Sequence, residues 1–191
     1  MSNIVTRFMI ETLISSKTRI KLLLKFFLNS NTTGYLRSLE SEFGDSTNGI
    51  RLELNRLEEA GMLSTKVKGN KKYFQANTKH PLFGEIHNIM MKHVGLDRIV
   101  ETVVKRLGKV QVVYLAGSFA AGIDSPIIDL IFIGNIDINY LVKLIDKAER
   151  MIHRKIRYLI YEPEKADQID WSHFGQEPLL LWNQTENDEG Q

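Results

Sequence analysis

Residues 47–78, TNGIRLELNRLEEAGMLSTKVKGNKKYFQANT, decide how the N-terminal half of the chain folds. In their first part, apolar side chains recur at the spacing that brings them to one face of a helix. These side chains are Ile50, Leu54 and Leu57. Ala60-Gly61 then marks the end of the pattern, because glycine commonly terminates a helix. We therefore expect a helix that begins near Thr47 and ends before Gly61.

The second part of this stretch shows the alternation that is typical of β-strands. Two such runs, Leu63–Val67 and Tyr73–Ala76, are joined across Lys68-Gly69-Asn70-Lys71. Gly and Asn tolerate the positive φ angles of a tight hairpin turn. The sequence therefore predicts a β-hairpin directly after the helix.

Three further helices are expected upstream. Residues 4–14 have the apolar spacing of an amphipathic helix. Ser16 is a good N-cap for a second helix, KTRIKLLLKFFLN, which the polar segment SNTTG ends. A short third helix is expected over Tyr35–Phe43, followed by a turn at Gly44–Ser46. Helices, turn, longer helix and hairpin in this order predict a winged helix-turn-helix domain.

The second helix of a helix-turn-helix can read base edges if its N-terminal, outward side chains are short and polar or basic. The candidates for this role are Thr47, Asn48, Arg51 and Asn55. Arg can bond guanine, and Asn adenine, through two hydrogen bonds. The hairpin adds residues that suit DNA phosphates: Lys66, Lys68, Asn70, Lys71 and Lys72. Together these residues predict double-stranded DNA as a partner.

Other interpretations of the same residues stay open. The lysines can be solvated side chains that protect an edge strand from pairing with another chain. Arg51 can be an ordinary surface residue. We also expect Glu53 near the groove-facing surface, where it would repel phosphates or select cytosine. The hairpin lysines are therefore the stronger ground for DNA contact, and the helix is the weaker ground for sequence specificity.

The segment NRLEEAGMLSTKVKGNKKYFQAN, residues 55–77, resembles the end of the recognition helix and the wing of ArsR-type winged helix-turn-helix transcriptional regulators. The resemblance covers about residues 17–78 and implies a homodimer, for which helices 4–14 and 82–94 are the candidates. Metal-sensing members use Cys or paired His and acidic ligands. This chain has no Cys, and His87 and His93 fall on different helix faces, so we expect no metal site.

The pattern changes from Lys109 onward. Residues 112–134, VVYLAGSFAAGIDSPIIDLIFIG, place two apolar strands around a Gly-Ser turn. A helix over about 138–153 and a strand over Ile156–Tyr161 follow, which favours a sheet covered by helices. The segment resembles the signature of polymerase-beta-type minimal nucleotidyltransferases, in which a strand runs into Gly-Ser, a helix follows, and the next strand carries Asp-x-Asp. The resemblance covers roughly residues 96–182.

The chain departs from that signature at its acidic residues. In the family, clustered carboxylates hold two Mg²⁺ ions. Here Asp129 is the one acid of the motif, and Ile127 or Ile131 stands at the other position. The third strand offers Arg157 and Tyr158 but no acid. One carboxylate cannot hold two divalent ions, so we expect a degenerate domain with no catalytic residues, metal or cofactor, in a chain that is not an enzyme.

The Gly-Ser turn can still retain a pocket for a nucleotide or phosphate ligand. The candidates are Gly117, Ser118, Gly122, Asp129 and Arg157. The alternative is a tight strand–helix turn left from an enzyme ancestor. We expect a transcriptional regulator whose second domain senses a ligand or mediates interactions. The alternatives are a weakly active or divergent nucleotidyltransferase, and an antitoxin-like interaction module without a DNA role.

Charge and composition fit two modules. Residues 1–80 carry 13 Lys and Arg against 7 Asp and Glu, a net +6, whereas residues 81–191 carry 12 against 16, a net −4. We expect an α+β protein with a winged helix-turn-helix domain over 1–94, a small α/β nucleotidyltransferase-like domain over 95–185 and a disordered tail over 186–191. The sequence has no Cys, no signal-peptide pattern and no apolar run of membrane-spanning length, which predicts a cytoplasmic protein with no membrane partner.

Overall fold

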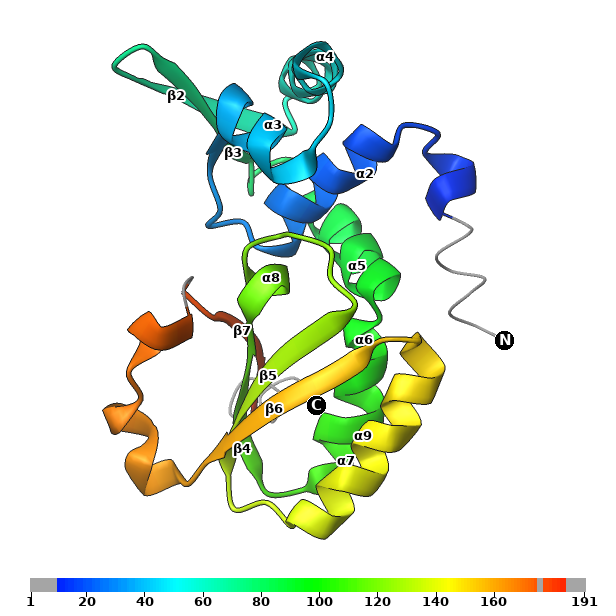
Figure 1. Ribbon diagram of the computed structural model, residues 1–191, viewed down its shortest axis with the longest axis vertical. Helices are drawn as coiled ribbons and strands as arrows, with labels where there is room; N and C mark the ends of the chain where they lie inside the picture. The colour runs from blue at the N-terminus through cyan, green and yellow to red at the C-terminus, as the bar shows by residue number, and fades with distance from the viewer. Residues whose placement is uncertain (1–9, 175–176, 185–191) are drawn as a thin grey trace. The chain divides into compact units, whose positions relative to one another are not determined.

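The computed structural model describes residues 10–174 and 177–184. The chain forms two compact units, which comprise residues 10–93 and 94–184 of the described part (Figure 1). Of the helix predicted over 4–14, only residues 10–14 are described, and 10–13 are helical. The tail predicted over 186–191 lies outside the described residues. No helix in the described part is long and apolar enough to cross a membrane.

The first unit combines helices with a small sheet. Along the chain its elements are α2 (Lys17–Leu23), which continues into η1 (Leu24–Leu28), β1 (Gly34–Tyr35), α3 (Leu36–Phe43), α4 (Thr47–Glu59), β2 (Leu63–Lys68), β3 (Lys71–Ala76) and α5 (Phe83–Val94). Two of the helices begin at a serine cap. The Ser16 hydroxyl accepts a hydrogen bond from the first turn of α2, and the Ser46 hydroxyl accepts one from the first turn of α4. Each serine thus supplies a partner for a backbone N–H that the helix itself leaves unpaired.

The three strands of this unit form an antiparallel sheet in the order β1-β3-β2. Lys68 pairs with Lys71 at the end of the hairpin, so the turn consists of Gly69-Asn70, with a φ of +61° at Gly69. β3 begins two residues before the predicted start at Tyr73. The sequence pattern does not predict β1, which pairs with β3 through residues 34 and 35.

The core of the first unit lies between α2, α3 and α4. The α4 side chains at helical spacing are buried, as expected: Ile50, Leu54 and Leu57. They pack where α4 contacts both α2 and α3, together with Leu22 of α2 and Leu39 of α3, which are fully buried. This burial fixes which side of α4 faces solvent.

The second unit begins with a helical segment and continues with a four-stranded sheet. Its elements are α6 (Leu96–Ile99), η2 (Val100–Val104), α7 (Lys105–Leu107), β4 (Val110–Ala116), α8 (Gly117–Ala120), β5 (Ile127–Gly134), α9 (Ile138–Ile152), β6 (Lys155–Tyr161), η3 (Pro163–Gln168), η4 (Trp171–Phe174) and β7 (Leu179–Asn183). The strand order is β6-β5-β4-β7. β4 runs antiparallel to β5 and β7, whereas β5 and β6 are parallel.

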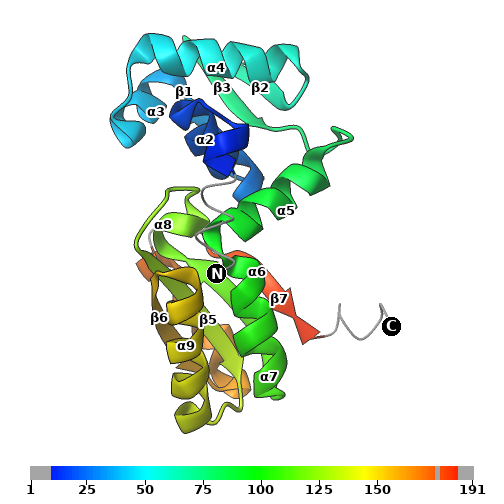
Figure 2. The same cartoon turned by 90° about the vertical axis from the view of Figure 1, so that its right-hand side faces the viewer.

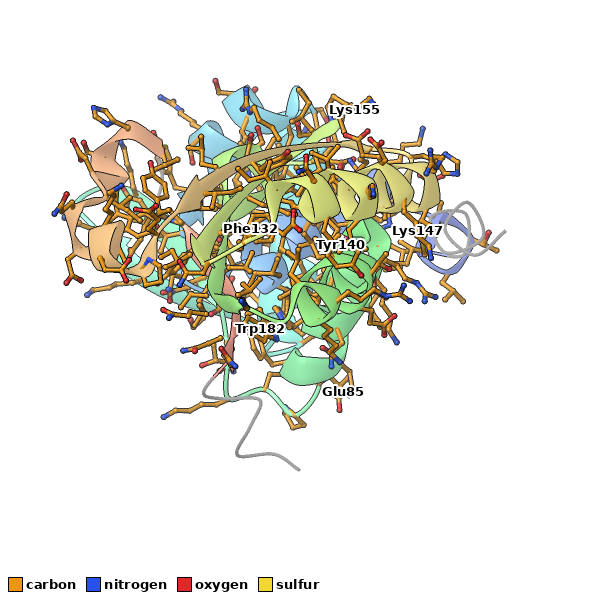
Figure 3. All side chains as sticks on the ribbon, turned by 90° about the horizontal axis from the view of Figure 1, so that it is seen from below. Glu85, Phe132, Tyr140, Lys147, Lys155 and Trp182 are labelled. Atoms are coloured by element: carbon orange, nitrogen blue, oxygen red, sulfur yellow. The ribbon has the colours of Figure 1, made fainter. Side chains whose placement is uncertain are left out.

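The two faces of this sheet differ in what covers them. The α6–α7 segment and α9 pack together on one face (Figure 2). Phe132 of β5 is fully buried, whereas Lys147 of α9 is exposed (Figure 3). On the other face Trp171 of η4 meets Tyr114 of β4 edge-on, with ring centroids 5.0 Å apart. The chain is therefore a mixed α+β protein, and its second sheet has long helices on one face.

Candidate functional site

The solvent-facing side of α4 is the first candidate site. The exposed side chains along its centre are Asn48, Leu52, Asn55 and Glu59, and Arg56 is exposed on the flank nearer α2. Arg51 is exposed on the flank nearer the hairpin, and Thr47, in the first turn, is half-buried. Within the described part of the chain, the side chains of Asn48, Arg51 and Asn55 make no hydrogen bond or ion pair. The predicted polar side chains of α4 are therefore accessible to a ligand.

α4 and the β2–β3 hairpin border one groove of about 460 Å³. The groove brings together most of the predicted DNA-binding residues: Arg51, Asn55, Asn70, Lys71 and Lys72. It also includes Tyr35 of β1 and Arg37 of α3, to which no sequence pattern points. Lys71 Nζ lies 4.4 Å from the centre of the Tyr35 ring, so the aromatic face holds this ammonium group at the edge of the groove.

The four hairpin lysines do not form one cluster. Lys72 Nζ lies 2.6 Å from a carboxylate oxygen of Glu58 on α4, and this ion pair ties β3 to α4. Lys66 and Lys68 instead line a second hollow with Thr33 and Gln75. Lys72 therefore already has an anionic partner, whereas the other three lysines form no ion pair with any residue that the structure describes.

Glu53 does not face a groove, and the expectation that it repels phosphates or selects cytosine is wrong. Its side chain is 7% exposed, and Glu53 Oε2 accepts a hydrogen bond of 2.8 Å from Arg19 Nε of α2. Arg56 Nη1 lies 3.4 Å from the other oxygen. Position 53 follows Ile50 by three residues and so falls on the core-facing side of the helix.

The environment of Glu53 keeps it ionised. Burial raises the pKa of its carboxyl, but hydrogen bonds from Arg19 and Ser16 and the positive charges of Arg19 and Arg56 lower it by more. The net result is a pKa below the ordinary value of 4.5. Glu53 is therefore an internal anion that binds two arginines beside α4.

The second candidate site lies where β4 ends, on the sheet face opposite α9. Gly117 has a φ of +62°, and a Cβ at this position would collide with the carboxylate of Asp129 on β5. Asp129 stands opposite Arg157 in the parallel pairing of β5 with β6, and Arg157 Nε donates a hydrogen bond to its carboxylate. These three residues border a hollow of about 290 Å³ that Phe174 of η4 also lines. Three of the five predicted ligand-binding residues are thus brought together.

Of the other two predicted ligand-binding residues, Ser118 lies in α8 and Gly122 lies in the turn that follows it. The Ser118 carbonyl oxygen accepts a hydrogen bond from the backbone of Ile123, and Gly122 N–H donates one to Phe119. Neither Ser118 nor Gly122 lines the hollow beside Asp129. Their contacts shape the loop that leads from α8 to β5.

An arginine that the sequence pattern does not single out holds this loop in place. Arg154, just before β6, is 8% exposed, and its guanidinium lies 5.1 Å from the centre of the Phe119 ring. Its Nη1 atom lies 2.8 Å from a carboxylate oxygen of Asp124 and also donates to the Ser125 carbonyl oxygen. Asp124 is therefore a loop residue that is paired with Arg154.

Within β5 and β6, both fully described, Asp129 is the one carboxylate. By strand alternation, Ile127 and Ile131 share its face of β5. Arg157 and Leu159 occupy the corresponding face of β6. Residues 10–174 and 177–184 contain no group of three or more His, Cys, Asp or Glu side chains placed to hold a metal ion.

No protein-family model matches the sequence, and no curated protein matches it. Several solved structures resemble about half of the chain. One is the tri-AMPylated HEPN toxin of Shewanella oneidensis in complex with MNT antitoxin, at 17% identity over 50% of this chain and 75% of that chain, with a TM-score of 0.35. A second is the MntA–HepT toxin–antitoxin pair, at 16% identity over 50% of this chain and 75% of that chain, with a TM-score of 0.34. A third is a protein of Sulfolobus solfataricus proposed to be a nucleotidyltransferase, at 21% identity over 49% of this chain and 82% of that chain, with a TM-score of 0.34.

The third of these neighbours is proposed to be a nucleotidyltransferase, and the prediction that the chain is not an enzyme is therefore wrong. An incomplete Asp-x-Asp motif does not determine whether the whole chain is an enzyme. Two of the neighbours are complexes of a toxin with an antitoxin.

Proposed function

We propose that the chain is a DNA-binding transcriptional regulator in which residues 17–78 form an ArsR-type winged helix-turn-helix. The observation that carries the proposal is the groove that α4 shares with the hairpin, because it joins Arg51 and Asn55 to Lys71. The succession of α2, α3, α4, β2 and β3 supports it, because helices followed by a hairpin in this order are what a winged helix-turn-helix requires.

The dimensions of α4 suit a duplex. The helix has 13 residues and is therefore about 20 Å long, and the major groove is about 12 Å wide, enough to admit a helix. With α4 in that groove, Asn48, Arg51 and Asn55 face base edges. Lys71 and Arg37 then lie where a phosphate backbone passes between α4 and the hairpin. Phosphate contacts position the protein, and base contacts specify the sequence.

Fluorescence anisotropy with the full-length chain tests this function. We expect binding to a random-sequence duplex that weakens steeply as salt is raised. On a duplex selected from a random library, Arg51→Ala should cost about 1–3 kcal/mol, with little effect on random duplex. Arg150→Ala, which removes an exposed arginine from α9, is the matched control and should change neither affinity. Failure of the wild-type chain to bind duplex at low salt would refute the proposal.

We propose a homodimer as the binding species. The face of α5 exposes Ile89 at 44%, and Leu82, just before α5, is 54% exposed, which leaves apolar surface for a second copy. A two-fold dimer would place its two α4 helices about one DNA turn apart. Light scattering should give twice the chain mass, and Ile89→Lys should shift the chain toward the monomer. A wild-type monomer at all concentrations would exclude this arrangement.

A divergent nucleotidyltransferase is the second candidate function, and the surroundings of Gly117 favour it. The glycine turn at the end of β4 allows close approach to its backbone, and the Asp129 carboxylate lies against it in an open hollow. The same hollow is the proposed site of a nucleotide or phosphate ligand. A phosphate there would be close to the Arg157 guanidinium, which is 72% exposed.

Pyrophosphate release from Mg-ATP tests this second candidate. Turnover that Asp129→Asn abolishes would support it, and equal rates in the wild type and in Asp129→Asn would reject it. Calorimetric titration of ATP without Mg²⁺ measures the ligand-binding role separately. Binding that Arg157→Ala weakens, without turnover, would assign the hollow to ligand sensing.

A further inference from the structure

Leu52 lies in the middle of the solvent-facing side of α4 and is 51% exposed. Residues three and four apart are neighbours on a helix surface, so Leu52 lies between Asn48 and Asn55. Both asparagines are exposed. A large apolar side chain between two free amides has no packing role within the first unit, whose core lies on the other side of α4.

Positive charge lies on both flanks of this face. Arg51 is on the hairpin side, where it lines the groove with Lys71. On the α2 side, the buried Glu53 binds Arg56 and Arg19. The face therefore has an apolar and amide centre between two cationic margins. The charge is not continued to the end of the helix, because Glu59 is exposed there.

This distribution of groups matches the major groove of a duplex. Phosphates run along both edges of the groove, and base edges lie between them. Asn can bond adenine through two hydrogen bonds, and the one apolar group that the bases present in this groove is the C5-methyl of thymine. Glu59 would meet phosphates unfavourably, so the part of α4 from Thr47 to Asn55 is the part that enters.

Resting on the proposed DNA-binding function, we propose that Leu52 is a specificity-determining residue that contacts the C5-methyl of a thymine in the major groove. Asn48 and Asn55 bond adenines beside it, so the bound half-site is rich in A·T pairs. Replacing that thymine by uracil removes one methyl group from the contact. The expected loss of affinity is about fourfold, which corresponds to the burial of one methyl-sized group.

The experiment begins with a selection by the full-length chain from duplexes with a randomised centre. The preferred duplex is resynthesised with deoxyuridine in place of one thymidine at a time, and anisotropy measures binding of the wild type and of Leu52→Ala. One uracil position should weaken the wild type about fourfold, and Leu52→Ala should bind the thymine and uracil duplexes equally. Leu180→Ala, from a leucine that is 42% exposed on β7, is the control and should discriminate as the wild type does.

The outcomes separate the two proposals. Absence of binding to any duplex overturns the proposed function and this inference with it. Binding without a uracil-sensitive position, or with the same uracil sensitivity in Leu52→Ala, overturns the role of Leu52 and leaves DNA binding standing. A merely structural role of Leu52 would lower affinity for the thymine and uracil duplexes by the same factor and so preserve their ratio.

Discussion

Replacing Lys66, Lys68 and Lys71 together by Ala should make DNA binding far less sensitive to salt. These hairpin lysines have no carboxylate partner among the described residues, so each is available to a phosphate. Each phosphate contact steepens the plot of log K against log salt concentration by about 0.9, so the triple variant should have a slope shallower by about 2.7. Between about 50 and 200 mM salt, the wild type should lose about 40-fold more affinity than the variant does.

Lys72 provides the matched control, because it is bound to Glu58 on α4. The double variant Lys72→Ala/Glu58→Ala removes this pair without changing the net charge. Its slope should stay within about 0.5 of the wild-type value, which is a smaller change than the loss of one phosphate contact would cause.

Anisotropy with a random-sequence duplex at five or more salt concentrations measures these slopes, and circular dichroism establishes that each variant is folded. A triple variant with the wild-type slope would refute the assignment of the hairpin to DNA. A double variant whose slope is shallower than the wild type's by about 0.9, the contribution of one phosphate contact, would show that Lys72 leaves Glu58 for a phosphate.

Three further predictions concern stability. Glu53→Gln should lower the free energy of unfolding by about 1–3 kcal/mol at pH 7. The folded-state pKa of Glu53 is lowered from 4.5, so the difference in free energy of unfolding between the wild type and this variant should have its full value above about pH 5. This difference should shrink as pH falls through the folded-state pKa, and denaturant titrations that give the same difference at every pH would contradict the argument. Gly117→Ala should cost about 1–2 kcal/mol, because its φ is positive and a carboxylate occupies the space of the new Cβ. Gly84→Ala, at an open helical position, is its control and should not destabilise, so equal melting temperatures of the two variants would refute the argument. Arg154→Ala should cost about 1–3 kcal/mol and speed proteolytic cleavage between β4 and β6, because it removes a buried guanidinium that packs on Phe119 and donates a hydrogen bond to the Ser125 carbonyl oxygen; unchanged melting and cleavage would refute the role of Arg154.

Local patterns predict the regular elements of the first unit well. The buried face of α4 and the pairing across Gly69-Asn70 follow from periodicity and turn chemistry, which depend on neighbouring residues. β1 has two residues, too few to show alternation, and exists because β3 lies beside it. β7 is likewise recognised only by its pairing with β4.

The candidate sites are less predictable, because their residues come from separate elements. The spacing from Ile50 places Glu53 on the core-facing side of α4, but the group that makes a buried carboxylate acceptable there, Arg19, is 34 residues away and no local pattern reveals it. Arg37 joins the groove through the packing of α3, and no local pattern marks it. At the second site, the sequence alone does not show that Asp129 and Arg157 are neighbours. Their contact follows from the parallel register of β5 and β6, which only the structure gives.

The hairpin is held on both of its sides before any duplex arrives. Tyr35 retains the ammonium group of Lys71, and Glu58 retains that of Lys72. A hairpin that is preorganised in this way loses little conformational entropy on docking. If the chain binds DNA as proposed, diffusion and electrostatic steering should govern the rate of association, with no slow refolding step, and the rate should fall as salt screens the encounter.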